Sequence, residues 1–211
     1  MRRNRYLALA PLIAVSLLQA CVPLIGAGGI VAVSALEDRR TTGTQLEDQG
    51  IELRAQGRIQ ERLGERAHVN VTSFNRLVLL TGEAWDEVTR DEVEKIVAAV
   101  PNVRGVTNEV QVAGVSSTAS RANDTALTAK VKTRLLNAKE FNSLHVKVVT
   151  EAGVVYLLGL VTEPEADAVT ELARTTGGVR KVVKVFEYCK STDELCRPSA
   201  PPADKPKPPR A

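Results

Sequence analysis

Five side chains in this sequence of 211 residues are of the types that most often do covalent or acid–base chemistry: three cysteines and two histidines. His68 and His145 each stand at the start of an expected strand, 77 positions apart, so a repeated structural role explains them better than catalysis or metal binding. The Gly26-Ala27-Gly28-Gly29 stretch lacks the preceding strand that a phosphate-binding loop requires. No nucleophile and base pair is evident. We therefore expect a protein that is not an enzyme and that binds no metal or cofactor.

The N-terminus places the first cysteine in a specific context. Three arginines precede an apolar run that ends in Leu18-Gln19-Ala20-Cys21, and this order is typical of an export signal over residues 1–20. The ending resembles the lipobox of bacterial lipoproteins, in which the cysteine becomes the first mature residue and carries acyl chains such as palmitate. The resemblance implies lipidation of Cys21. Because residue 22 is Val and not Asp, it also implies an outer-membrane protein that faces the periplasm. The alternative is an uncleaved signal anchor, since apolar residues resume after Cys21.

The other two cysteines, Cys189 and Cys196, lie seven positions apart near the end of the chain. In an exported protein an intrachain disulfide across this short loop is a reasonable expectation, because the periplasm is oxidising. Two free thiols are the alternative. A zinc site would need more ligands than this region offers.

An internal repeat organises the rest of the chain. The segment VLLTGE at 78–83 corresponds to VYLLGL at 155–160, and HVNV at 68–71 corresponds to HVKV at 145–148, both at an offset of 77. Each half predicts a helix, two strands joined as a hairpin, a second helix and a last strand. The first helices are expected at 51–63 and at 125–137, the latter capped by Asn123 or Asp124, and the second helices at 86–100 and 164–175.

This order predicts an α+β fold of two tandem α-β-β-α-β domains, each a small three-stranded mixed sheet with two helices on one face. Gly82 and Gly159 occupy the same place in each copy. Glycine weakens a strand interior, so its repetition indicates a close backbone approach. We expect both glycines to allow tight packing between strand and helix.

The repeat and its strand-ending glycines resemble two BON domains. Together with the lipobox they are similar to the dual BON-domain outer-membrane lipoproteins of Gram-negative bacteria. The implied divisions are a signal peptide at 1–20, a lipidated lead and linker at 21–43, BON domains at 44–114 and 121–190, and a Pro-rich disordered tail at 191–211.

Charge separates the two domains and limits the partners. Residues 44–114 hold eight Lys/Arg and twelve Asp/Glu, net −4, whereas 121–190 hold eleven and eight, net +3. An anionic membrane would attract the second domain and repel the first. The formal charge of the whole chain is only +3 and aromatic residues make up 3 %, so nucleic acid is a poor candidate. The alternative is that both charged surfaces are simply solvated.

The helix at 125–137 carries the candidate lipid contact. Leu127, Val131 and Leu135 form its core stripe, while Leu136 falls on the outer side between Lys130 and Lys132. An apolar side chain between two ammonium groups suits a membrane surface.

The resemblance adds that this helix of the second BON domain is the one associated with anionic phospholipid. It implies contacts at positions that here are Ala126, Val131 and Leu136. Ala126 departs from the aromatic residue of a close relative, so we expect lipid binding to be weaker here or to be supplied by Arg121, Lys130 and Lys132. The alternative function is a tethered protein-interaction module that contacts outer-membrane assembly or cell-wall factors, with Trp85 as a candidate contact.

Overall fold

The computed structural model describes residues 38–138 and 141–196, which belong to one compact unit spanning Glu37–Ala211. The signal segment, Cys21 and the chain from residue 197 lie outside the described residues. Among the helices that are described, none combines the length and the apolar character needed to cross a bilayer.

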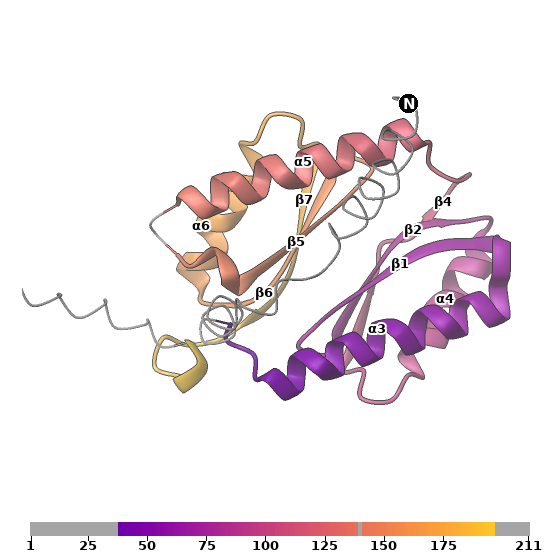
Figure 1. The fold of residues 1–211 in the computed structure, drawn as a ribbon, viewed down its shortest axis with the longest axis horizontal. Coiled ribbons are helices and arrows are strands. Elements are labelled where there is room, and N and C mark those ends of the chain that lie inside the picture. Colours follow the sequence, from indigo (N-terminus) through magenta and orange to yellow (C-terminus); the bar gives the residue numbers. More distant parts are fainter. Residues whose placement is uncertain (1–37, 139–140, 197–211) are drawn as a thin grey trace, which may run out of the picture. The chain divides into compact units, whose positions relative to one another are not determined.

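The first domain is a helix, a hairpin, a second helix and a broken last strand (Figure 1). Its strands are ordered β1-β2-β3, with β1 antiparallel to β2, and with β3 and the short β4 both parallel to β2. The elements are α3 (Thr42–Leu63), η2 (Gly64–Arg66), β1 (Ala67–Phe74), β2 (Leu77–Ala84), α4 (Glu87–Ala98), β3 (Gly105–Asn108) and β4 (Gln111–Val112).

The second domain repeats this order with an unbroken last strand. Its sheet is ordered β5-β6-β7, antiparallel and then parallel. The elements are α5 (Thr118–Asn137), η3 (Ser143–His145), β5 (Val146–Glu151), β6 (Val154–Val161), α6 (Glu163–Arg174), β7 (Lys181–Tyr188) and η4 (Glu194–Cys196).

The expected α+β fold with two α-β-β-α-β domains is confirmed, but the first sheet has four strands in place of the expected three, because its last strand is divided into β3 and β4. The helix starts also differ. Thr41 caps α3 and Ser117 caps α5, so both helices begin earlier than the apolar periodicity indicated. Asp124 lies inside α5 and does not cap it. The first turns of both helices carry few apolar residues, so no apolar stripe marks them in the sequence, and the capping hydroxyls of Thr41 and Ser117 stabilise them.

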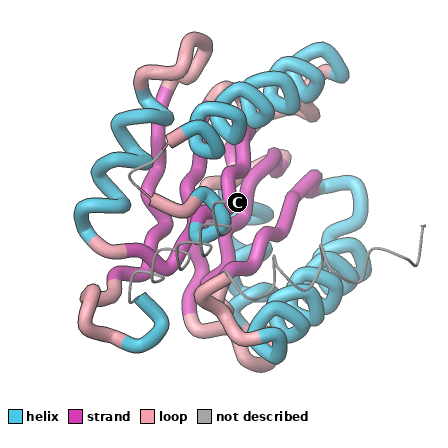
Figure 2. Tube along the Cα trace, turned by 60° about the vertical axis from the view of Figure 1, so that its left-hand side comes forward, coloured by secondary structure: helices cyan, strands magenta, loops and turns pink. Residues whose placement is uncertain are grey.

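Each domain buries one apolar cluster between its helices and its sheet. In both domains the helices and strands form separate layers (Figure 2). Alternate residues of the central strands face the helices, as the period of two in a strand requires. These are Val78, Leu80 and Ala84 in the first domain, and Val155, Leu157 and Val161 in the second.

A third apolar cluster joins the opposite faces of the two sheets. Leu79 of β2 and Phe74 of β1 pack with Tyr156, Leu158 and Leu160 of β6. Burial, with the nearby charges of Glu109 and Glu151, raises the pKa of Tyr156 to about 12. Cys196 completes the cluster: it is bonded to Cys189 and fully buried. Residues 191–196, which the sequence assigned to the tail, are therefore part of the fold.

A helix carboxylate fixes each hairpin turn. Asn75 and Arg76 in the first turn, and Ala152 and Gly153 in the second, all have positive φ, as a two-residue hairpin of type I′ requires. Asp124 accepts the backbone N–H groups of Ala152 and Gly153 at 2.9 and 2.8 Å.

Asp48 does the same in the first domain. It accepts the backbone N–H groups of Asn75 and Arg76 at 2.9 and 2.7 Å, and both carboxylates are almost fully buried. The repeat thus extends to a contact that hydrophobic periodicity does not reveal.

The paired glycines lie within strands β2 and β6 and approach the neighbouring strand. A side chain at Gly82, where φ is +111°, would collide with the carbonyl oxygen of His68, and a Cβ at Gly159 would lie 2.6 Å from that of His145. The expectation of a close backbone approach is correct. The nearest neighbour, however, is not a packed α-helix: it is backbone of β1 for Gly82, and for Gly159 it is the last residue of η3, directly before β5.

Two consecutive arginines of the expected linker bind different domains. Arg39 forms two bonds with Glu165 of α6, at 2.7 and 2.9 Å, and also donates to the Leu160 carbonyl. Arg40 pairs with Asp48 of α3 at 2.9 Å. The segment before α3 is therefore a clamp on both domains, not a free linker.

We predict that Asp124→Ala lowers the free energy of unfolding by about 1–3 kcal/mol, because two buried N–H groups lose their acceptor at a turn that already contains Ala152 at positive φ. Urea denaturation of residues 37–211 measures the change. Asn123→Ala, the exposed neighbour on the same helix, is the matched control. Equal stability of the two variants would contradict this role.

Glu165 makes the stability depend on pH in the acid range. Burial by itself raises its pKa, but hydrogen bonds from Arg39 and Thr162 outweigh this and lower it from 4.5 to about 2. A carboxylate with a lowered pKa stabilises the fold above its unfolded value, and this contribution is lost as pH falls from about 4.5 toward 2.

We expect Glu165→Gln to lower the free energy of unfolding at pH 7 by about 2–3 kcal/mol and to flatten its decline between pH 5 and pH 2. Glu171→Gln is the control, because its ion pair with Arg174 is exposed and contributes little. Parallel pH profiles for the parent and Glu165→Gln would refute the assignment.

Candidate functional site

The outer face of α5 holds four of the five residues expected to contact lipid. Leu127, Val131 and Leu135 are at most 3 % exposed, so the predicted core stripe is correct. Val131 is fully buried within the core of the second domain, so it cannot touch a head group. The prediction that Val131 contacts lipid is therefore wrong, and the residue packs in the core.

The four remaining residues are all exposed, but they do not line one cavity. Lys132 and Leu136 are one turn apart and line the same cavity. Lys130 lies on the other flank of the helix, in a shallow depression with Ala129 and Thr133. Ala126 lines neither. Only Lys132 and Leu136 are therefore brought together.

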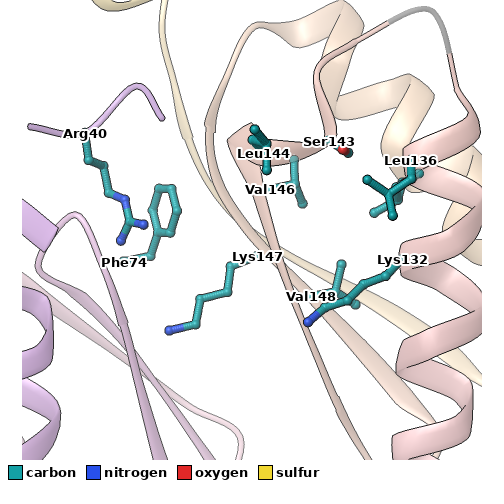
Figure 3. A pocket seen from close by; sticks show the side chains of 10 residues that line it. Arg40, Phe74, Lys132, Leu136, Ser143, Leu144, Val146, Lys147 and Val148 are labelled. Carbon is teal, nitrogen blue, oxygen red and sulfur yellow. The ribbon is translucent and has the colours of Figure 1, made fainter. Parts of the chain in front are cut away.

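The cavity beside Lys132 and Leu136 has a volume of about 320 Å³. Figure 3 shows α5 on one side, the segment from Ser143 to Val148 behind, and Arg40 with Phe74 on the opposite side. Most of its walls are apolar. They are formed by Phe74, Leu135, Leu136, Leu144, Val146 and Val148.

Three cations surround this cavity, and two of them are neutralised. The Arg40 guanidinium lies 3.9 Å from the centre of the Phe74 ring and pairs with Asp38 and Asp48 at 2.8 and 2.9 Å. Burial lowers the pKa of Arg40, but the two carboxylates outweigh it and raise the pKa overall. The guanidinium is thus a permanent charge.

Lys147 and Lys132 differ in their pairing. The Lys147 ammonium lies 3.0 Å from Glu52 of α3. Within residues 38–138 and 141–196, Lys132 has no hydrogen bond or ion pair. It is therefore the cation at this cavity whose charge is left for a ligand.

Sequence reasoning missed the far wall of the cavity. Arg40 and Phe74 lie 96 and 62 residues before Leu136, and Lys147 comes from the neighbouring strand β5, so no local pattern joins these residues to α5. Leu144 carries the one available signal: an apolar residue directly before the repeated HVKV segment, 42 % exposed in the structure.

A second exposed apolar group lies on the first domain. Trp85 is 63 % exposed, and Val88, the second residue of α4, is 75 % exposed. Val112 is 45 % exposed and pairs with Ala84, the residue before Trp85. We call these three residues the Trp85 surface. Asp86 and Glu87 stand between them in the sequence, so the surface is acidic.

The described part of the chain contains no group of three His, Cys, Asp or Glu side chains arranged to hold a metal ion. The positions of His68 and His145 next to the paired glycines explain their repetition, because their carbonyl oxygens occupy the space that a Cβ would need.

Comparison with known proteins agrees with the repeat. The chain is 35 % identical to the outer membrane lipoprotein DolP of Haemophilus influenzae over 173 residues, which cover 81 % of this chain and 90 % of that protein. It is 33 % identical to the 21 kDa hemolysin of Actinobacillus pleuropneumoniae, covering 72 % and 79 %. It is 32 % identical to the osmotically-inducible protein Y of Escherichia coli, covering 54 % and 58 %.

The BON domain model matches twice, at residues 52–114 and 123–190. The two matches fall on the two α-β-β-α-β units of the structure and include both hairpins and both paired glycines. The chain therefore belongs to the BON-domain family and carries two copies of the domain in tandem.

Proposed function

We propose that this protein is a non-enzymatic outer-membrane lipoprotein that faces the periplasm and binds anionic phospholipid through α5 of its second BON domain. Binding would support the integrity of the envelope. The Leu-x-Ala-Cys ending at Cys21 and the similarity to a relative named as an outer membrane lipoprotein support the anchor and the compartment.

The observation that carries lipid binding is the charge of the exposed face of α5. Its basic residues are Arg121, Lys130, Lys132 and Arg134, all exposed. Its one carboxylate, Asp124, is buried and occupied by the hairpin turn. Thus no acid on the outer face of this helix opposes an anionic surface.

The equivalent helix of the first domain differs. α3 carries Glu47, Asp48, Glu52 and Glu61 among its basic residues. Near an anionic membrane each Lys or Arg contributes about 1 kcal/mol. The electrostatic term thus favours α5 over α3 as the contact.

Leu136 supplies the apolar part of the proposed contact. Its side chain is 68 % exposed and lies one turn from Lys132. An exposed leucine gains free energy when it enters the interface between head groups and acyl chains, while the lysine beside it stays at the phosphates.

We expect residues 37–211, without the lipid anchor, to float with vesicles that contain anionic lipid and to bind more weakly as salt rises. Lys132→Glu should lower the partition coefficient about tenfold or more, because one attraction becomes a repulsion. Leu136→Glu should lower it similarly. Flotation with phosphatidylglycerol vesicles measures both changes.

The matched control for Leu136→Glu is Leu53→Glu, at an exposed leucine on α3. Lys130→Glu tests whether the other flank of α5 also contributes. Equal flotation with neutral and anionic vesicles, or an equal loss on Leu53→Glu, would contradict the proposed contact.

The Trp85 surface favours a second candidate function, a tethered module that binds outer-membrane assembly or cell-wall factors. Its apolar residues stand in the domain with net charge −4, so an anionic membrane would repel it and a basic protein partner would suit it.

For this candidate we expect a photo-crosslinker at position 85 to capture a defined protein in cells, while one at position 53, which is also exposed, does not. Mass spectrometry of the crosslinked species reads out the partner. Failure to capture a protein at position 85, or identical products at both positions, would count against it.

A further inference from the structure

The cavity beside α5 suggests a more specific ligand than a membrane surface. Its walls come from four separate segments: α5, residues 143–148, the segment before α3 with Arg40, and the end of β1 with Phe74. At about 320 Å³ it falls at the lower end of the range for small-molecule sites. Its width and depth are thus set by tertiary contacts and not by one flexible loop.

We propose that this cavity takes part of one acyl chain of an anionic membrane lipid, with the phosphate of that lipid at Lys132. The inference rests on the proposed function, because it names what enters the protein when α5 meets the membrane. A lipid chain and its head group match the two kinds of wall present, an apolar interior and one available cation.

The distribution of charge selects this occupant. Arg40 and Lys147 are held by carboxylates, so their alkyl stems and the Phe74 ring serve as walls. Of the three cations that line the cavity, Lys132 is the one without a partner among the described residues, and it belongs to the exposed face of α5. A free phosphate would gain only this one contact and would leave the apolar walls unused.

The rim of the cavity also matches a chain that enters from a bilayer. Leu136 and Leu144 are 68 % and 42 % exposed, although both line the cavity. Each of these two leucines therefore presents apolar surface both to the solvent and to the interior of the cavity. Val146 and Val148 lie deeper and are at most 9 % exposed.

Monomeric n-alkyl phosphates test the proposal without a bilayer. Residues 37–211 would be titrated with chains of 6, 8, 10 and 12 carbons, below the concentrations at which they form micelles, with calorimetry and methyl NMR as readouts. We expect affinity to rise about fourfold per methylene until the cavity is filled. Methyl signals of Leu144 and Val148 should shift, and inorganic phosphate should produce no such shift.

Two pairs of variants separate the parts of the site. Ser143→Trp fills the cavity from its wall and should weaken the 10-carbon phosphate at least tenfold, whereas Ser143→Ala should leave it unchanged. Lys132→Glu should weaken alkyl phosphates but leave neutral alkyl glucosides of equal length unaffected. Thermal unfolding of each variant verifies that the fold is retained.

The outcomes distinguish this proposal from the proposed function. If anionic vesicles bind but affinity for alkyl phosphates does not depend on chain length, or Ser143→Trp binds them as well as Ser143→Ala, the cavity site is refuted and surface binding stands. If alkyl phosphates bind in the cavity but anionic vesicles do not, the site stands and the membrane function fails.

Discussion

A small sheet with helices on only one face leaves its other face open to water, and this constraint determines how the two domains depend on each other. Leu79 in one sheet, and Leu158 and Leu160 in the other, are at most 6 % exposed because the open faces share one cluster. Either domain alone would expose these residues. Burial of apolar area is the dominant favourable term in folding. The tandem repeat is therefore better regarded as one folding unit than as two domains that fold independently.

Packing of the open faces brings charged side chains of the two domains together at the edges. Glu52 meets Lys147, Arg104 meets Glu187, and the two clamp arginines reach Glu165 and Asp48. The Glu52–Lys147 and Arg104–Glu187 pairs are partly exposed and contribute little individually, so their main effect is to fix how the domains are placed. These pairs also neutralise two of the three cations that line the cavity. Lys132 is the one that has no partner in the described chain.

The sequence allowed the fold to be predicted because its evidence is local and repeated: the strand pattern, the hairpin turn and a glycine recur at an offset of 77, and a helical periodicity stands before and after them in each half. The buried Val131 and the exposed Leu136 followed from helix geometry alone. The clamp at Arg39, the role of Asp124 and the far wall of the cavity could not be predicted. Each depends on a polar or apolar contact between residues distant in the chain, and such contacts leave no periodic signal.

Ala126 limits the apolar contact that the surface of α5 can make with a lipid. An aromatic residue there would add a large interfacial contact, whereas Ala126 is exposed and offers only a methyl group. If lipid binding used the surface of α5 alone, Leu136 would supply most of the apolar contact by itself. The cavity changes this balance, because Leu136, Leu144 and Val148 together offer apolar surface that is partly hidden from water already. In the proposed mechanism, the apolar walls of the cavity beside α5 supply the contact that an aromatic residue at position 126 would have made on the surface of the helix.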